Sequence, residues 1–220
     1  MSDRQKTVFV LHTSFATVEM FRQLLEAHLL GVRIVNVVDD SLLADVRAAG
    51  RVTPSVTRRM VGYAVLAQGA GADAIFSTCS SVGEVADLIR QAVDIPVVKI
   101  DDCMAEEAVA LGERVAVVAT VPTTLEPTAR LIASKGRDIG REVEIRRHLV
   151  EGAFDALMAG RADEHDRLVM AEVERAAQGA DVVVLAQASM ARLVPQLGEL
   201  PVPVLSSPLG GVESLRRALQ

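Results

Sequence analysis

Short runs of Val, Ile, Leu and Ala alternate along the chain with longer segments whose apolar residues recur every three or four positions. Runs that are apolar on both faces are typical of strands in a parallel sheet, and the longer segments are typical of amphipathic helices. The predicted strands are Val8–Leu11, Val32–Val38, Ala74–Phe76, Val97–Ile100, Val115–Ala119, Val143–Arg146, Val182–Leu185 and Val202–Leu205. The predicted helices are Thr17–Leu29, Ser55–Gln68, Val82–Ala92, Ala105–Leu111, Leu125–Ser134 and Asp163–Ala177. This alternation predicts an α/β fold with mainly parallel sheets flanked by helices and joined by right-handed crossovers.

One α/β unit occurs twice in the sequence. Gly71-Ala72-Asp73 followed by AIFSTCSSVGEVADLI aligns with Gly179-Ala180-Asp181 followed by VVVLAQASMARLVPQL, and VFVLHTS aligns with VAVVATV at nearly the same offset of about 108 positions. The repeat predicts two similar lobes, residues 1–100 and 101–207, related by a pseudo-twofold axis. We expect a last helix at 208–220 to pack back on the first lobe. Equivalent loops of such lobes face each other, so the cleft between the lobes is the expected active site.

Composition narrows the class of partner. Asp and Glu outnumber Lys and Arg by 29 to 23, and only 3% of the residues are aromatic. A nucleic-acid platform needs basic blocks and stacking rings, and a membrane helix needs ~20 apolar residues in a row, so neither partner is expected. Two cysteines are too few for a disulfide framework. We expect a reduced cytoplasmic protein that forms a homo-oligomer.

Loops rich in hydroxyl groups follow the predicted strands. Ligands of open parallel sheets bind beyond the carboxyl ends of the strands, where helix N-termini and hydroxyls attract carboxylates and developing oxyanions. Ser and Thr also cap helices, which explains any single loop equally well, but the number of such loops favours an anion site. The loops are His12-Thr13-Ser14, Ser77-Thr78-Cys79-Ser80-Ser81, Thr120-Val121-Pro122-Thr123-Thr124, Ala186-Gln187-Ala188-Ser189 and Ser206-Ser207-Pro208.

Cys79 lies where a strand turns into a helix, among hydroxyl donors. A helix N-terminus lowers the pKa of a thiol, so Cys79 is the candidate acid/base or nucleophile. The alternative is a small buried hydrophobic residue. Cys103, which follows Asp101-Asp102, is expected to be structural.

Among the four histidines, His12 ends the first strand and is the one expected to reach the ligand. His28 is expected to be solvated or packed, and His165 has no evident partner. The pair Arg146-Arg147 is assigned no role. The chain has no zinc-type spacing of Cys and His, no GxGxxG and no glycine loop before a phosphate-binding Lys, so no metal or cofactor is expected.

Several of these segments together resemble the aspartate/glutamate/hydantoin racemase superfamily. The segments are the strand ending in HTS, STCSSVG, IPVVKIDD leading to MAEEAV, ATVPTT, DVVVLAQASM and the final PVLSSP, and they cover nearly the whole chain in order. The resemblance implies two similar α/β lobes and cofactor-independent chemistry. In the racemases, two cysteines on opposite faces of the substrate exchange its α-proton while helix-terminal N–H groups and hydroxyls hold the carboxylate.

This chain departs from the two-cysteine pattern. Cys79 falls on the first cysteine position, but Gln187 occupies the second, and a neutral amide cannot accept or deliver a proton as a thiol does. Arylmalonate decarboxylases keep one cysteine in the second half, and maleate cis–trans isomerases use the first-half cysteine as a nucleophile. The chain thus resembles a single-cysteine branch with isomerase, epimerase or lyase chemistry. If the reaction is a racemisation, His12 or a bound water is expected to serve the opposite face.

The loops and the resemblance together lead to one set of expected site residues and to three alternative functions. The first function is a cofactor-independent isomerase of the racemase or epimerase type, acting on a small carboxylic acid or carbonyl compound. The alternatives are a cofactor-free lyase or decarboxylase that protonates an enediolate, and a two-lobed ligand-binding protein without turnover. The expected catalytic residues are Cys79, Gln187 and His12. The expected substrate-binding residues are Thr13, Ser14, Thr78, Ser80, Ser81, Thr120, Thr123, Ala188 and Ser189.

Overall fold

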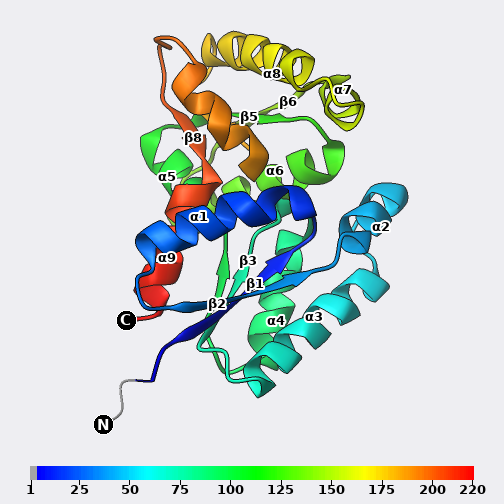
Figure 1. Ribbon diagram of the computed structural model, residues 1–220. Helices are drawn as coiled ribbons and strands as arrows, with labels where there is room; N and C mark the ends of the chain where they lie inside the picture. The colour runs from blue at the N-terminus through cyan, green and yellow to red at the C-terminus, as the bar shows by residue number, and fades with distance from the viewer. Residues whose placement is uncertain (1–3) are drawn as a thin grey trace. The chain divides into compact units, whose positions relative to one another are not determined.

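The computed structural model describes residues 4–220, which form two compact units (Figure 1). Unit 1 comprises the chain through Ile100 together with Pro208–Gln220, and unit 2 comprises Asp101–Ser207. Each unit holds one four-stranded parallel sheet flanked by helices, so the predicted α/β class is confirmed.

The sheet of unit 1, sheet A, has the strand order β2-β1-β3-β4 with every pair parallel. The central strands β1 and β3 are almost entirely buried because their apolar residues face helices on both sides. The edge strand β2 is only half-buried. The strands are β1 Thr7–His12, β2 Arg33–Val38, β3 Ala74–Ser77 and β4 Val97–Lys99.

Helices of unit 1 cover both faces of sheet A. On one face, α2, α3 and the segment after β3 pack in a single apolar cluster with Leu11 and Ile75. On the other face, Phe21 of α1 meets the ring of Phe76 edge-on at 5.8 Å between centroids. The helices are η1 Phe15–Thr17, α1 Val18–His28, α2 Ser41–Ala49, α3 Pro54–Gly69, η2 Ser80–Val85, α4 Ala86–Ala92 and α9 Ser207–Ala218, where η denotes a 3-10 helix.

Local sequence signals fix the ends of two of these helices. The Thr53 hydroxyl accepts the Val56 N–H at 3.3 Å, and Pro54 occupies the first turn, so α3 begins with a side-chain cap. Gly50 ends α2 with φ of 66°, a left-handed conformation that favours glycine. These two signals place the turn between α2 and α3.

Unit 2 repeats the same topology. Its sheet, sheet B, has the order β6-β5-β7-β8 and is parallel throughout. Helices α5 and α6 cover one face, and α8 covers the other. The strands are β5 Arg114–Ala119, β6 Glu144–Leu149, β7 Val182–Leu185 and β8 Val204–Ser206, and the helices are α5 Asp102–Leu111, α6 Pro122–Asp138, α7 Ala153–Met158, α8 Ala162–Ala177 and η3 Ala188–Gln196.

Each repeat has an aspartate that plays the same role at the amino ends of the strands. The Asp73 carboxylate accepts the N–H of Thr7 at the start of β1 at 2.7 Å and pairs with Arg4. The Asp181 carboxylate accepts the N–H of Arg114 at the start of β5 at 2.9 Å and pairs with the Arg114 guanidinium. The Gly-Ala-Asp sequence that defines the repeat therefore fixes the amino ends of the first strand in each sheet.

The structure differs from the predicted elements in four places. Helices α2 and α7 were not among the predicted helices, because each is short and offers little apolar periodicity. The segment from Ala188 is a 3-10 helix containing Pro195 rather than a regular helical stripe. The predicted helix at Val82–Ala92 begins as 3-10 helix η2 and becomes α-helical only at Ala86.

Each unit also contains a helix that follows the other unit's last strand. Helix α5 follows β4 but packs against α6 and β7 of unit 2, and α9 follows β8 but lies in unit 1 from Pro208 onward. Helix α9 comes very close to Ile100, the residue that follows β4. A Cβ at Gly211 would lie 2.7 Å from the Ile100 carbonyl oxygen. This approach requires a residue without a side chain.

Replacing Gly211 by alanine is expected to destabilise the fold. The added methyl group meets backbone atoms of Ile100 that cannot move aside, so the free energy of unfolding should fall by about 1–3 kcal/mol in urea titrations. Gly62→Ala is the matched control, because a Cβ at this helical position meets nothing within 4 Å. It should raise the free energy by about 0.5–1 kcal/mol. Equal effects of the two substitutions would contradict the close approach.

Candidate functional site

The carboxyl edge of sheet A brings two of the hydroxyl-rich loops together. Strands β1 and β3 are neighbours in register, with Leu11 opposite Ser77, so the loops that follow them lie side by side. The Thr78 hydroxyl and the Thr78 N–H both donate to the Leu11 carbonyl, at 3.0 and 3.2 Å. These bonds fix the backbone directly before Cys79.

Cys79 is half-buried and lies immediately before η2. Hydrogen bonding by the Thr13 hydroxyl, the backbone N–H groups of Ser81 and Val82 and the Ser81 hydroxyl favours its thiolate form, and the Val82 N–H also donates to the Cys79 carbonyl at 3.3 Å. Three of these donors come from the turn that the chain makes immediately after Cys79. The fourth comes from the loop after β1, which the strand order places next to it.

The expectation that the surroundings lower the pKa of Cys79 is wrong. Burial of the thiol raises its pKa, and the hydrogen bonds to the sulfur oppose this rise without cancelling it. The largest cause is the burial of the sulfur, and η2, a 3-10 helix of six residues, does little to offset it. Its peptide dipoles are few and poorly aligned, so they offset little of the cost of burying a charge.

His12 lies beside Cys79's loop but is closed off from solvent, with 1% of its surface exposed. Its Nε2 lies 2.9 Å from Asn36 Oδ1 and its Nδ1 lies 3.3 Å from Thr78 Oγ1. Burial lowers the pKa of His12, and the hydrogen bond with Asn36 opposes the shift, so the ring is neutral at pH 7. Both ring nitrogens are engaged by protein groups.

Asn36 is a site residue that the sequence analysis did not include. It lies on β2, opposite Val10 in the register, and its amide oxygen orients the His12 ring. It interrupts the apolar run IVNVV, and a polar residue within a predicted strand was the signal that could have found it.

The remaining predicted residues of unit 1 divide into two kinds. Ser80 and Ser81 are buried in the first turn of η2, next to Cys79. The Ser14 hydroxyl instead accepts the Ala16 N–H at 3.2 Å and so caps η1. The capping interpretation therefore holds for Ser14, which presents its hydroxyl to its own loop.

At the carboxyl edge of sheet B, Thr120 and Gln187 form the counterpart of Thr13 and Cys79. The Gln187 Oε1 accepts the Thr120 N–H at 2.6 Å and lies 3.0 Å from the Thr120 hydroxyl. Both repeats thus join the residue after the first strand to the residue after the third strand. In unit 2 the joined group is a neutral amide rather than a thiol.

The first turn of α6 leaves one hydroxyl without a partner among the described residues. Val121 precedes the helix and provides no side-chain cap, and the Thr123 Oγ1 is buried without a hydrogen-bond partner among the described residues. Pro122 has no N–H, and the Thr124 and Leu125 N–H groups both donate to the Val121 carbonyl at 3.2 Å. Ala188 and Ser189 are half-buried in the first turn of η3, directly after Gln187.

The other residues singled out in the sequence lie away from these groups within their own units. His165 has a partner, contrary to expectation: its Nδ1 lies 2.7 Å from Asp166, whose carboxylate also binds Arg192 of η3. His28 is exposed. His148 pairs with Glu172 at 2.6 Å. Arg146 and Arg147 are exposed and bind Glu144 and Glu126, as expected of a solvated face.

Residues 4–220 contain no group of three or more His, Cys, Asp or Glu side chains arranged to hold a metal ion. In the same range, no helix has both the length and the apolar character needed to span a bilayer.

Several solved structures share this fold. A Yersinia pestis protein assigned as an Asp/Glu racemase superposes with a TM-score of 0.73 at 17% identity, covering 98% of this chain and 100% of its own. Glutamate racemase from Francisella tularensis gives 0.70 at 15% identity over 98% and 81% of the two chains. Allantoin racemase from Klebsiella pneumoniae gives 0.69 at 18% identity over 96% and 86%. At these identities the likeness establishes the fold.

Sequence comparison adds the family. No curated protein is recognisably similar to the chain. The sequence model of the Asp/Glu/hydantoin racemase family, however, matches residues 12–215, a span that includes Cys79, Gln187 and the loops around them. The chain therefore belongs to the Asp/Glu/hydantoin racemase family and is an enzyme of the racemase or isomerase type.

Proposed function

We propose that this enzyme is a cofactor-independent racemase or epimerase of a small carboxylic acid or carbonyl compound, with Cys79 as its proton-transfer group. The set of hydrogen-bond donors around the Cys79 sulfur carries the proposal. A thiol that only fills space has no need of the Thr13 hydroxyl and two backbone N–H groups directed at it. Such donors stabilise a thiolate, which is the state that proton transfer creates.

The raised pKa of Cys79 determines the protonation state of its thiol in the resting enzyme. At neutral pH the Cys79 thiol keeps its proton, so it can deliver this proton to the α-carbon of an enediolate. The S–H bond breaks as the C–H bond forms, and the sulfur retains the electron pair as a thiolate held by its donors. In the reverse direction the thiolate takes the α-proton, and the electron pair left on carbon becomes the enediolate.

The remaining predicted residues are proposed as substrate-binding and positioning groups. The Thr123 hydroxyl, which has no partner among the described residues, supports a carboxylate-binding role for the first turn of α6, since a free donor suits an anion. His12 is proposed to position Thr78, and thereby Cys79, because its ring is buried and neutral. The proposed binding residues are Thr13, Ser14, Thr78, Ser80, Ser81, Thr120, Thr123, Ala188 and Ser189.

The group that serves the second face of the substrate is proposed to be a bound water. Gln187 holds a neutral amide, and both His12 ring nitrogens are already bonded to protein groups. That the Cys79 and Gln187 loops act on one substrate stays a prediction, as do the cytoplasmic location and the homo-oligomeric assembly.

A cofactor-free lyase is the second candidate, and the amide at Gln187 favours it. Decarboxylation requires a proton on only one face of the enediolate, which one thiol supplies. A non-catalytic ligand-binding protein has no comparable support, because a binding site does not need a hydrogen-bonded thiol.

Deuterium uptake distinguishes these functions. A panel of small carboxylic acids is incubated with the enzyme in D2O and followed by NMR. A racemase or epimerase should introduce deuterium at the α-carbon, a lyase should yield a smaller labelled product, and a binding protein should do neither. Cys79→Ala should lower turnover by at least about 10²–10⁴-fold, the usual contribution of a positioned acid or base. Cys103→Ala should leave turnover unchanged, and full turnover by Cys79→Ala would contradict the proposal.

Alkylation by iodoacetamide should report the pKa of Cys79 directly. The experiment uses the Cys103→Ala background, in which Cys79 is the only thiol. Because burial raises the pKa, the alkylation rate should still be increasing with pH above about pH 9. Thr13→Val removes a bond that favours the thiolate, so it should raise the pKa further and slow alkylation at pH 8 on the order of ten-fold. Thr17→Val, whose hydroxyl contacts the Ser14 carbonyl instead, should have no such effect.

Introducing a second thiol should favour racemisation. Gln187→Cys restores the group that the resemblance places at this position, and we expect the racemisation rate of the identified substrate to rise by about 10²-fold or more. Gln187→Ser removes the same amide without adding a thiol and should not raise the rate. A rise of the same size with both variants would show that loss of the amide, rather than the thiol, is responsible.

A further inference from the structure

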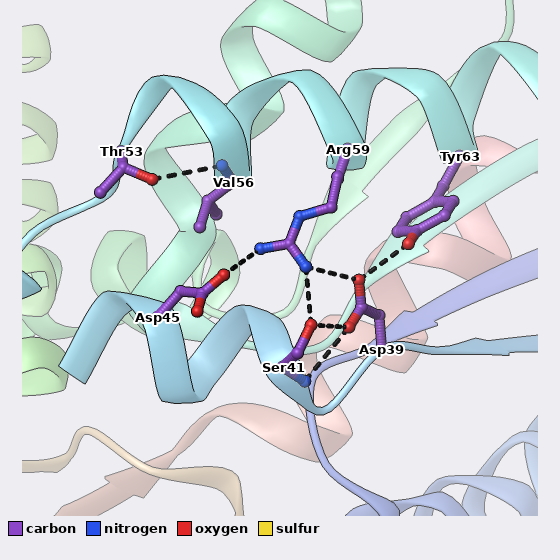
Figure 2. A network of polar contacts seen from close by, with 7 residues as sticks. All are labelled: Asp39, Ser41, Asp45, Thr53, Val56, Arg59 and Tyr63. Carbon is purple, nitrogen blue, oxygen red and sulfur yellow. Dashed lines mark hydrogen bonds and ion pairs between the residues drawn. The ribbon is translucent and has the colours of Figure 1, made fainter. Parts of the chain in front are cut away.

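A polar network lies at the carboxyl end of β2, with the Asp39 carboxylate at its centre (Figure 2). One Asp39 oxygen accepts the Ser41 N–H at 3.1 Å and the Ser41 hydroxyl at 2.5 Å. The other accepts the Tyr63 hydroxyl at 2.7 Å and the Arg59 guanidinium at 3.2 Å. The carboxylate is thus bonded by four donors, which is far more than a solvated surface charge requires.

Arg59 extends the network to a second helix. Figure 2 shows Arg59 and Tyr63 pointing from α3 toward Asp39, and the guanidinium also donates to Ser41 Oγ at 2.6 Å and to the Asp45 carboxylate. Burial opposes ionisation of Asp39, but the bonds from Ser41 and Tyr63 and the charge of Arg59 outweigh it and lower the pKa of Asp39. The network therefore joins the end of β2, helix α2 and helix α3 through a charged group.

This network is connected to the Cys79 site by the backbone. The Asp39 N–H donates to the His12 carbonyl at 3.1 Å. The residue after His12 is Thr13, whose hydroxyl bonds the Cys79 sulfur. A fixed Asp39 therefore fixes the start of the loop that carries this donor.

A second connection runs through apolar packing. Leu42 and Val46 of α2 belong to the same buried cluster as Val82 and Val85 of η2. Helix η2 supplies the Ser81 and Val82 N–H groups that bond the same sulfur. The network holds α2 against α3, and α2 in turn supports η2.

We infer that Asp39, Arg59 and Tyr63 are positioning residues that hold the hydrogen-bond donors of Cys79 in place. None of the three contacts the sulfur; each acts through the Thr13 loop or through α2 and η2. The inference concerns the free enzyme and its test uses no substrate, so it fails or succeeds separately from the proposed reaction.

Tyr63 offers a direct report on the network, because it is the only tyrosine in a chain without tryptophan. The hydrogen bond to Asp39, burial and the Asp39 charge raise the pKa of Tyr63. Titration of phenol absorbance should therefore show ionisation above the usual range near pH 10, and Asp39→Asn should bring it down. An ordinary titration in the parent protein would show that the network does not form and would overturn the inference.

A double-mutant cycle tests the positioning itself in the Cys103→Ala background. Thr13→Val is expected to slow alkylation of Cys79 at pH 8 on the order of ten-fold in the parent protein. Tyr63→Phe removes one hydroxyl and no charge. If Tyr63→Phe displaces the Thr13 hydroxyl, this hydroxyl no longer contributes in the variant. Thr13→Val should then slow alkylation of the Tyr63→Phe variant by less than about three-fold. Arg59→Lys should reduce the Thr13 effect in the same way.

Asp73→Asn is the matched control, because Asp73 is also a hydrogen-bonded, ion-paired aspartate, at the opposite edge of the same sheet. It should lower the free energy of unfolding while leaving the ten-fold effect of Thr13→Val intact. If Tyr63→Phe and Arg59→Lys also leave the ten-fold effect intact, the network is a stability element only and the inference is overturned. If Tyr63→Phe fails to fold, Arg59→Lys decides between the two results.

Discussion

The adjacency of the first and third strands in each parallel sheet is the constraint on which both candidate sites depend. Leu11 lies opposite Ser77 in sheet A, and Val118 lies opposite Leu185 in sheet B. Because parallel neighbours end at the same edge, the residue after one strand meets the residue after the other. The order therefore places Thr13 next to Cys79 and brings the Gln187 side-chain amide within reach of Thr120.

The same backbone arrangement gives the two edges different chemistry. A sulfur that is buried and hydrogen-bonded holds its proton at neutral pH but has donors ready for the thiolate, so its protonation state can change during a reaction. An amide bonded to Thr120 keeps one state at every pH that the fold tolerates. One substitution within a repeated topology thus separates a proton-transfer group from a fixed polar group.

The sequence predicted the features that depend on local pattern and repetition. Val182–Leu185 is a strand with the predicted bounds because its four apolar residues are buried on both faces. The sign of the Cys79 pKa shift could not be predicted, since it depends on how deeply neighbouring elements bury the sulfur and on the 3-10 geometry of η2. Asn36 was missed for a similar reason: its importance comes from His12, which only the register of β1 and β2 brings to it.

Buried hydroxyls without hydrogen-bond partners show where the fold loses stability. Such a group loses about 1–3 kcal/mol relative to a satisfied one. Among the described residues, Ser77 ends β3, Ser207 follows β8 and Thr123 lies in the first turn after β5, and each has a buried oxygen without a partner. Thr128, within α6, is the exception. Three of these four hydroxyls therefore lie at the carboxyl edges of the sheets, beside the loops that carry the candidate site residues, so the fold accepts most of this cost where its candidate chemistry is located.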